Sequence, residues 1–109
     1  MKPVTFLGDA LDAVRDFPAS ARNEAGFQLG RVQQGLDPVD WKPMPSIGAG
    51  VREIRVRDAA GAFRVIYIAN LPNAVYVLHA FQKKTQQTAQ RDIDTAARRL
   101  RQIIRSVGK

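Results

Sequence analysis

The sequence predicts a single α+β domain over residues 1–109, with an antiparallel sheet, an N-terminal helical hairpin and a C-terminal helix. Three observations predict this class. Apolar residues recur at helical spacing in two stretches near the N-terminus and in one near the C-terminus. Three runs rich in β-branched and aromatic residues lie between them. A chain of 109 residues is long enough for one core between packed layers. The expected order of elements is β-α-α-β-β-β-α.

The first third of the chain predicts a short strand and two helices. Residues 4–7 (VTFL) are expected to form an edge strand. Asp9 is suited to cap the helix that follows, and Pro18 ends it. A second helix is expected over residues 19–34, closed by Gly35. Its apolar face is made of Ala21, Ala25, Leu29 and Val32. The short join predicts an antiparallel hairpin of helices.

Residues 36–50 have no hydrophobic period and are rich in proline and glycine. They predict a long loop, which in a small domain is either functional or packed on the surface. The loop holds Trp41, the single tryptophan. Its indole has two interpretations: it plugs one end of the core, or it faces a binding groove.

Residues 51–58 and 63–70 predict two strands joined by a turn at residues 59–62. A symmetric turn places Arg57 opposite Arg64. One face then carries a set of apolar side chains: Ile54, Val56, Val65 and Tyr67. The other face carries a mixed set: Glu53, Arg55, Arg57, Arg64, Ile66 and Ile68. Three arginines on one face repel one another unless an anion lies over them. The alternative is a solvated outer face.

The segment VYVLHAFQKKTQQT, residues 75–88, begins as a buried strand and then becomes polar. It brings a histidine, a phenylalanine and two lysines to one end of the sheet: His79, Phe81, Lys83 and Lys84. Such a strand presents cationic and stacking groups on a rigid platform, as an anionic ligand requires. The alternative is that the lysines only make a strand end soluble.

The last element is expected to be a helix over residues 91–107, capped by Thr88 or Gln90. Its apolar stripe is expected to pack on the sheet and consists of Ile93, Ala97, Leu100, Ile104 and Val107. A second side gathers arginines: Arg91, Arg98, Arg101 and Arg105. They could bind phosphate or form a solvated face.

The composition favours an anionic partner. The net charge is +7 and the pI is near 10.6, which suits nucleic acid, an acidic protein or a lipid surface. The chain has no cysteine, which fits a reducing cytoplasm. No apolar run approaches the roughly 18 residues of a membrane span, so we expect a cytoplasmic protein that does not enter a membrane.

The side chains available for chemistry are few. One histidine cannot build a multi-histidine metal site, two glutamates do not favour paired-carboxylate hydrolysis, and no glycine-rich loop resembles a nucleotide cradle. We therefore expect no metal and no cofactor. The remaining arginines, lysines, histidine and hydroxyls suit cleavage of RNA by its own 2′-hydroxyl, because the substrate supplies the nucleophile.

The element order and three motifs resemble the RelE/ParE toxin superfamily of bacterial toxin–antitoxin systems, and within it the phage-derived HigB-like branch. The motifs are WKPMPSIGAGVREIRVRD, FRVIYI, and VYVLHAFQKKTQQT followed by RDI. The resemblance implies a small toxin that cleaves mRNA, generally on translating ribosomes. It also implies a cognate helix-turn-helix antitoxin as partner.

Site residues follow from the resemblance by position. Arg64 matches the arginine that faces the scissile phosphate, and Arg55 matches the basic position on the preceding strand. Relatives often use a C-terminal tyrosine as general acid, whereas no tyrosine follows Tyr76 here. We expect catalytic roles for Arg55, Arg64, His79, Lys83 and Lys84, with His79 or Lys83 moving protons. RNA-binding roles are expected for Arg57, Phe81 and Arg98.

Two other functions fit the same fold. The ParE branch poisons DNA gyrase by protein contact and needs no phosphate site. A phage-derived RNA-binding module without catalysis would bind RNA in a salt-dependent way and cut nothing. Codon preference, oligomeric state and the identity of the antitoxin do not follow from the sequence.

Overall fold

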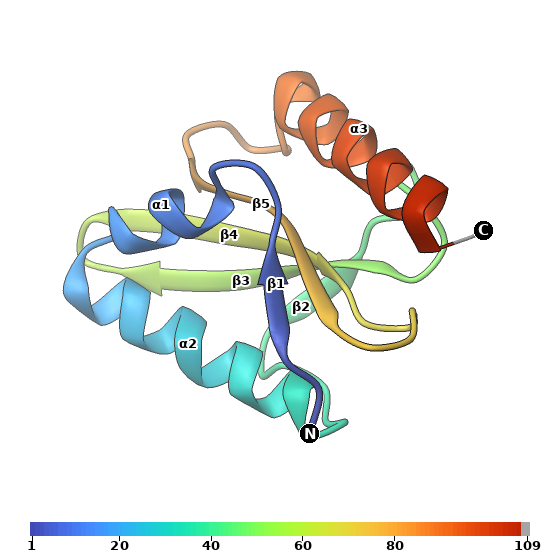
Figure 1. Ribbon diagram of the computed structural model, residues 1–109. Helices are drawn as coiled ribbons and strands as arrows, with labels where there is room; N and C mark the ends of the chain where they lie inside the picture. Colours follow the sequence, from blue (N-terminus) through green and yellow to red (C-terminus); the bar gives the residue numbers. More distant parts are fainter. Residues whose placement is uncertain (108–109) are drawn as a thin grey trace.

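Five strands form one sheet, with two helices on one face and a third on the other (Figure 1). The computed structural model describes residues 1–107, without the side chain of Val107. The elements, in chain order, are β1 (Val4–Phe6), α1 (Ala10–Arg15), α2 (Ala19–Gln33), β2 (Trp41–Pro43), β3 (Val51–Asp58), β4 (Gly61–Ile68), β5 (Val75–Lys83) and α3 (Gln90–Val107). The predicted α+β class is confirmed.

The strands lie in the order β1-β5-β4-β3-β2. Strands β2 to β5 form an antiparallel meander, and β1 lies parallel to β5 at the edge, with Val4 opposite Val75. The sequence prediction missed β2, which lies inside the expected loop. This strand has three residues and ends at Pro43. Proline fits there because an edge strand needs no further N–H donor.

The helical hairpin covers the face predicted to be apolar. Its buried side chains pack against the side chains of β3, β4 and β5, with Ile54 and Val65 fully buried. The apolar face predicted for the second helix is confirmed, since all four of its residues are buried. Phe17, between the two helices, is buried in the same core and packs on Phe63, with ring centroids 4.8 Å apart.

Helix α3 covers much of the other face. Ile66 and Ile68, expected beside the arginines, are buried under it. The helix packs through Ala96, Leu100 and Ile103, with Ile93 and Ala97 partly buried. Ile104, predicted in the buried stripe, is 51% exposed, so the stripe is rotated from its predicted position. Val107, also placed in that stripe, has its side chain outside the described part.

The β3–β4 turn is tighter than predicted. Asp58 lies opposite Gly61, so only Ala59 and Ala60 form the loop. The Asp58 carboxylate accepts a hydrogen bond from the Ala60 N–H at 2.8 Å, and Gly61 has a φ of +139°. These two features close a short turn. Arg55 is therefore the residue opposite Arg64, and the predicted pairing of Arg57 with Arg64 is wrong.

A β-bulge in β5 changes what faces α3. Strand β4 pairs Ile66 with His79 and Tyr67 with Val77, which leaves Leu78 as the extra residue. The Leu78 side chain packs under α3, and His79 bonds to α3 as well. Two consecutive side chains thus share one face. The free Leu78 carbonyl accepts a hydrogen bond from Arg99 at 3.0 Å.

Arg99 also explains why Asp9 does not act as a capping side chain. The Asp9 carboxylate makes no cap hydrogen bond and instead accepts one from the Arg99 guanidinium at 2.8 Å. This bond lowers the pKa of Asp9. Arg99 therefore joins α3 both to the bulge in β5 and to the start of α1.

Candidate functional site

Polar and charged side chains form a grid on the α3 face of the sheet, at the end near the β3–β4 turn. Strand pairing arranges the grid in three rows. The first holds Arg57, Ala62 and Lys83, the second holds Arg55, Arg64 and Phe81, and the third holds Lys42, Glu53, Ile66 and His79. Directly opposed residues on neighbouring strands lie about 5 Å apart at Cβ. We call this set the cationic grid.

Arg64 lies at the centre of the grid and is only 4% exposed. Its guanidinium donates a hydrogen bond to the Phe63 carbonyl at 3.0 Å, and its Nε lies 3.4 Å from Glu53 Oε1. Burial lowers the pKa of Arg64, and the Glu53 carboxylate opposes that effect. An anion can reach this guanidinium only by displacing the side chains around it.

Glu53 is the anion of the grid and is fully buried. Besides Arg64, its Oε1 lies 3.9 Å from Lys42 Nζ. Its Oε2 accepts a hydrogen bond from the Thr88 hydroxyl at 2.7 Å. Thr88, predicted as a possible helix cap, therefore fixes this carboxylate instead. The segment between β5 and α3 is thus attached to the grid.

Buried polar atoms without a hydrogen-bond partner gather in the grid. The described residues contain five such side-chain atoms, and four of them belong to the grid: Glu53 Oε1, Arg55 Nε, Arg64 Nε and His79 Nδ1. Buried polar atoms normally find partners because leaving one unpaired costs roughly 1–3 kcal/mol. Two of the four, Glu53 Oε1 and Arg64 Nε, face each other as an ion pair at 3.4 Å.

Lys83 and Arg55 are more accessible than Arg64. Arg55 is 35% exposed along its side chain, and its Nη1 lies 3.9 Å from the Asp40 carboxylate. Lys83 is half-buried at the end of β5. Burial lowers the pKa of Lys83, and the positive charge of Arg64 lowers it further. Its ammonium therefore gives up a proton more readily than that of a solvated lysine.

His79 is held by α3. Its Nε2 lies 2.7 Å from the Asp92 carboxylate, and both side chains are mostly covered, at 13% and 15% exposure. The imidazole also stacks on Phe81, with ring centroids 5.1 Å apart and 25° between the ring planes. His79 and Phe81 thus form a pair at the edge of the grid, with the imidazole already engaged.

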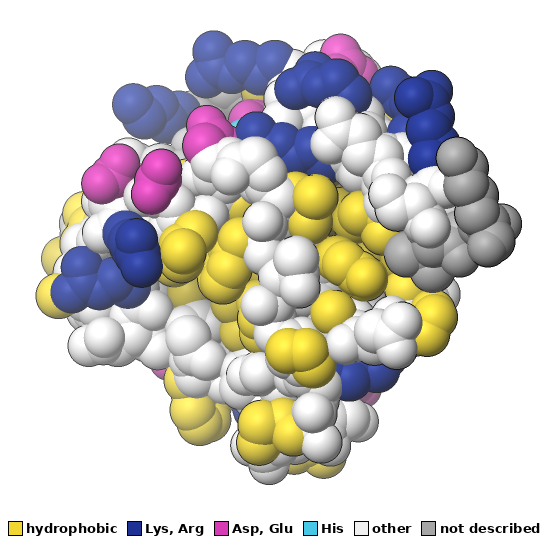
Figure 2. Space-filling view, in the orientation of Figure 1, with side chains coloured by type: hydrophobic (Ala, Val, Ile, Leu, Met, Phe, Trp, Pro, Cys, Tyr) yellow, Lys and Arg dark blue, Asp and Glu magenta, His cyan; other side chains and the backbone are white. Residues whose placement is uncertain are grey.

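Two residues predicted for the site are not brought into the grid. Lys84 follows the last residue of β5 and is exposed, and its side chain has no ion pair among the described residues. Arg98 lies on the exposed side of α3. Arg57 does belong to the grid and is exposed beside the turn. Figure 2 shows lysine and arginine side chains gathered over α3, along the upper part of the view.

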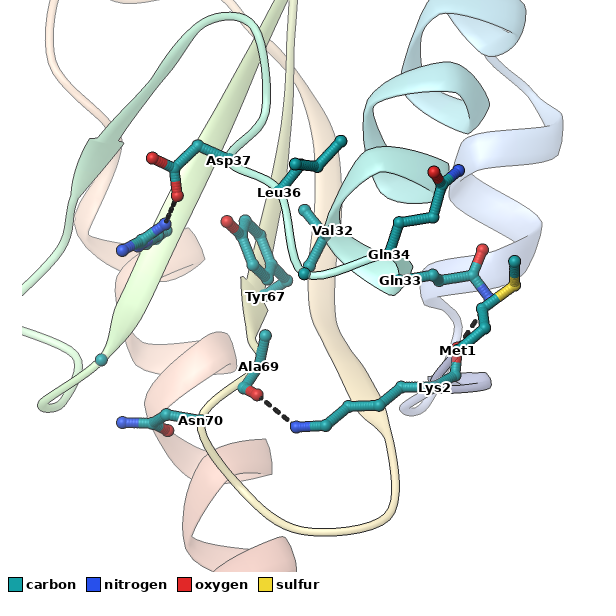
Figure 3. A pocket seen from close by; sticks show the side chains of 13 residues that line it. Met1, Lys2, Val32, Gln33, Gln34, Leu36, Asp37, Tyr67, Ala69 and Asn70 are labelled. Carbon is teal, nitrogen blue, oxygen red and sulfur yellow. Dashed lines mark hydrogen bonds and ion pairs between the residues drawn. The ribbon is translucent and has the colours of Figure 1, made fainter.

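A cleft lies elsewhere on the protein. It has a volume of about 640 Å³ and lies between the C-terminal end of α2, the N-terminal segment and the far ends of β3 and β4 (Figure 3). Arg52 and Tyr67 line it from the opposite face of the sheet. The Arg52 guanidinium binds Asp37 at 2.8 Å and lies 4.0 Å from the centre of the Trp41 ring. Trp41 is therefore remote from the cationic grid.

Two members of the grid and one residue that binds to it are not identified from the sequence. Lys42 lies on a strand where a loop is predicted, and Thr88 is predicted only as a helix cap. Glu53 is predicted on the same face as the arginines but without a role. An acidic residue that alternates with arginines on a buried strand is the signal that could have revealed its role, because a buried carboxylate needs partners. Among the described residues, no group of three acidic or histidine side chains is placed to hold a metal ion.

The fold and the grid define a small basic α+β protein with a cationic sheet face beneath a helix. Residues 12–101 match the family described as phage derived protein Gp49-like (DUF891). The chain belongs to this family, which is associated with the toxins of toxin–antitoxin systems. No curated protein matches the sequence significantly. No described helix is long and apolar enough to cross a membrane.

Proposed function

We propose that the chain is the toxin of a type II toxin–antitoxin system and acts as an endoribonuclease on mRNA, in the manner of RelE-like toxins. The observation that carries the proposal is the cationic grid, in which Arg55, Arg64 and Lys83 converge on one face. The unpaired buried polar atoms of the grid and the membership of the Gp49-like family support it. Binding to translating ribosomes and inhibition by a helix-turn-helix antitoxin belong to the same proposal.

The proposed reaction uses the substrate's own nucleophile. The 2′-hydroxyl of the RNA gives its proton to a water molecule and attacks the adjacent phosphorus, and the bond to the 5′-oxygen breaks as that oxygen takes up a proton. The products are a 2′,3′-cyclic phosphate and a 5′-hydroxyl. Negative charge builds on the phosphate oxygens in the transition state, and fixed cations stabilise it. Arg55 meets the phosphate first, and Arg64 reaches it once the surrounding side chains have moved.

Lys83 is the proposed proton donor to the 5′-oxygen. Its lowered pKa makes it a better acid than an ordinary lysine. His79 is the alternative, but its Nε2 is occupied by Asp92. Phe81 is placed to stack on a base beside the scissile phosphate, a contact worth about 1–3 kcal/mol. Arg57 and Arg98 would bind the flanking backbone.

The test is to induce the chain in a bacterium, with and without its neighbouring gene, and to map RNA ends. We expect new 5′-hydroxyl ends within mRNAs. Arg55→Ala and Arg64→Lys should lower the cleavage rate by about two to three decades, by analogy with losing an oxyanion donor. Arg64→Lys keeps a cation beside the buried Glu53 and so preserves the fold. Arg22→Ala, on the outer side of α2, serves as the control.

Other outcomes would contradict the nuclease proposal. Intact mRNA with broken chromosomes would indicate a gyrase inhibitor. Salt-dependent binding of naked RNA, with no scission in either cells or a reconstituted translation reaction, would indicate a binding module. Unchanged cleavage by both grid variants would refute the assignment of the site.

A further inference from the structure

Glu53, the anion of the cationic grid, has no role in the proposed reaction, although it lies against two of the cations of the grid. Glu53 is fully buried, while its oxygens lie near Arg64, Lys42 and Thr88. A carboxylate that only offset the charge of a solvated surface would be exposed. Burying a carboxylate is costly unless its partners hold it, so this position must be supported by its surroundings.

We propose that Glu53 is a positioning residue for RNA cleavage, which holds Arg64 and Lys42 in place for the phosphate and is itself fixed by Thr88. This inference rests on the proposed function. The geometry shows how Thr88, Glu53 and the two cations are linked. Thr88 binds Oε2, which fixes the plane of the carboxylate, and Oε1 then lies between the two cations at 3.4 Å and 3.9 Å.

The contact between Glu53 and Arg64 leaves the cation available. At 3.4 Å the Nε–Oε1 pair is an ion pair without the geometry of a hydrogen bond, and neither atom makes a hydrogen bond to another described residue. Such a contact orients the guanidinium but does not satisfy its donors. A phosphate entering the grid can therefore bind Arg64 without first breaking a hydrogen bond to Glu53.

Glu53 also acts on the pKa of Lys83, which lies two strands away on β5. Its negative charge raises the pKa of Lys83, against the larger effects of burial and of Arg64. Removing the carboxylate leaves Lys42, Arg55, Arg64 and Lys83 facing one another with no buried anion among them. These cations then repel one another, and the Lys83 amine loses its proton at a lower pH.

The test compares the two glutamates of the chain. Glu53→Gln keeps the size of the side chain and removes its charge. Glu24→Gln makes the same change on α2, where the carboxylate accepts a hydrogen bond from Gln28 and lies away from the grid. Cleavage is measured on a single-stranded RNA in a reconstituted translation reaction, and binding on the same RNA with a 2′-deoxy nucleotide at the cut site.

We expect Glu53→Gln to lower kcat about a hundredfold, as a misplacement of about 1 Å can do. Its binding to the uncleavable RNA should be unchanged or tighter, because an anion has left a cationic site. The alkaline limb of its pH–rate profile should move to lower pH. Glu24→Gln should resemble the unmodified protein in all three respects. A carboxylate that served only to offset charge would give a faster enzyme when removed, which would overturn the inference.

Two further measurements keep the inference separate from the proposed function. Thr88→Val leaves the charge of Glu53 but removes its fixing hydrogen bond, so kcat should fall while the pH profile stays in place. This variant also decides the matter if Glu53→Gln does not fold. If the unmodified protein cuts no RNA, NMR titration of ¹³C-dimethylated Lys83 still applies. If the pKa of Lys83 is the same in Glu53→Gln and Glu24→Gln, Glu53 does not act on the grid and the inference is wrong.

Discussion

Lys83 shows how one neighbour changes the chemistry of a side chain. It stands in the first row of the cationic grid, opposite Ala62, and is therefore diagonal to Arg64, two residues further along the adjacent strand. Burial and that positive charge both lower the pKa of its ammonium. A lysine in this setting loses its proton at a lower pH than a solvated lysine.

This position predicts a pH-dependent affinity for RNA. The charged form of Lys83 is present below its lowered pKa and is lost as the pH rises through it. Affinity for the 2′-deoxy RNA should therefore fall across that range, below the pH at which an ordinary lysine titrates near 10.4. In Lys83→Arg the charge persists, and the decline should disappear. Fluorescence anisotropy at several pH values measures this. An equal decline in both proteins would contradict the prediction.

The residue types of the site were predictable, whereas their neighbours were not. Alternation in residues 51–58 correctly placed Arg55 and Arg57 on one face. It could not reveal that Glu53 is buried, because burial depends on Lys42 and Thr88, which come from segments far away in the sequence. Lys84 was predicted with Lys83 because the two are adjacent, but strand β5 ends between them.

At the scale of elements, one arginine links α3 to two other parts of the fold. Arg99 is 12% exposed along its side chain and bonds both the Leu78 carbonyl and the Asp9 carboxylate. A bulge leaves the carbonyl of its extra residue without a partner on the neighbouring strand. The guanidinium supplies that partner and holds the helix over the apolar side chains on its face of the sheet.

Arg99→Met should lower the free energy of unfolding by about 1.5–3 kcal/mol, as expected for the loss of hydrogen bonds to a charged group. Methionine keeps much of the apolar stem, so the loss reports mainly on the guanidinium. The control is Arg98→Met, one residue earlier and exposed, which should change stability by less than about 0.5 kcal/mol. Urea denaturation followed by circular dichroism measures both. Equal stabilities would show that the bulge needs no partner from α3.

Errors in the predicted elements have identifiable causes. The predicted β3–β4 turn is two residues too wide. The prediction did not use Asp58 and Gly61, which are the residues that close the observed turn. A slip of two residues keeps each side chain on its face, so the predicted core survived the error. The stripe of α3 was misplaced by one residue at its C-terminal end, where Ile103 and Ile104 are both apolar and only packing decides between them.

For the whole molecule, the net charge of +7 predicts binding that depends strongly on salt. If about four cations contact RNA phosphates, log K should fall with log salt at a slope of about −2.8. Arg55→Ala and Arg98→Ala should each reduce the slope by about 0.7. Arg22→Ala should leave it unchanged. A slope that is reduced by Arg55→Ala but not by Arg98→Ala would show that the RNA contacts the sheet and not α3.

The pairing of β1 with β5 has a consequence for synthesis. Val4 can pair with Val75 only after about seventy more residues have been synthesised, so the parallel edge of the sheet forms late. A domain whose strands join over such a distance folds slowly and late. The grid likewise needs β5 for Phe81 and Lys83, so a nascent chain carries no assembled site until most of it has left the ribosome. On the proposed function, the ribosome that synthesises the chain would meet an assembled site only late in synthesis.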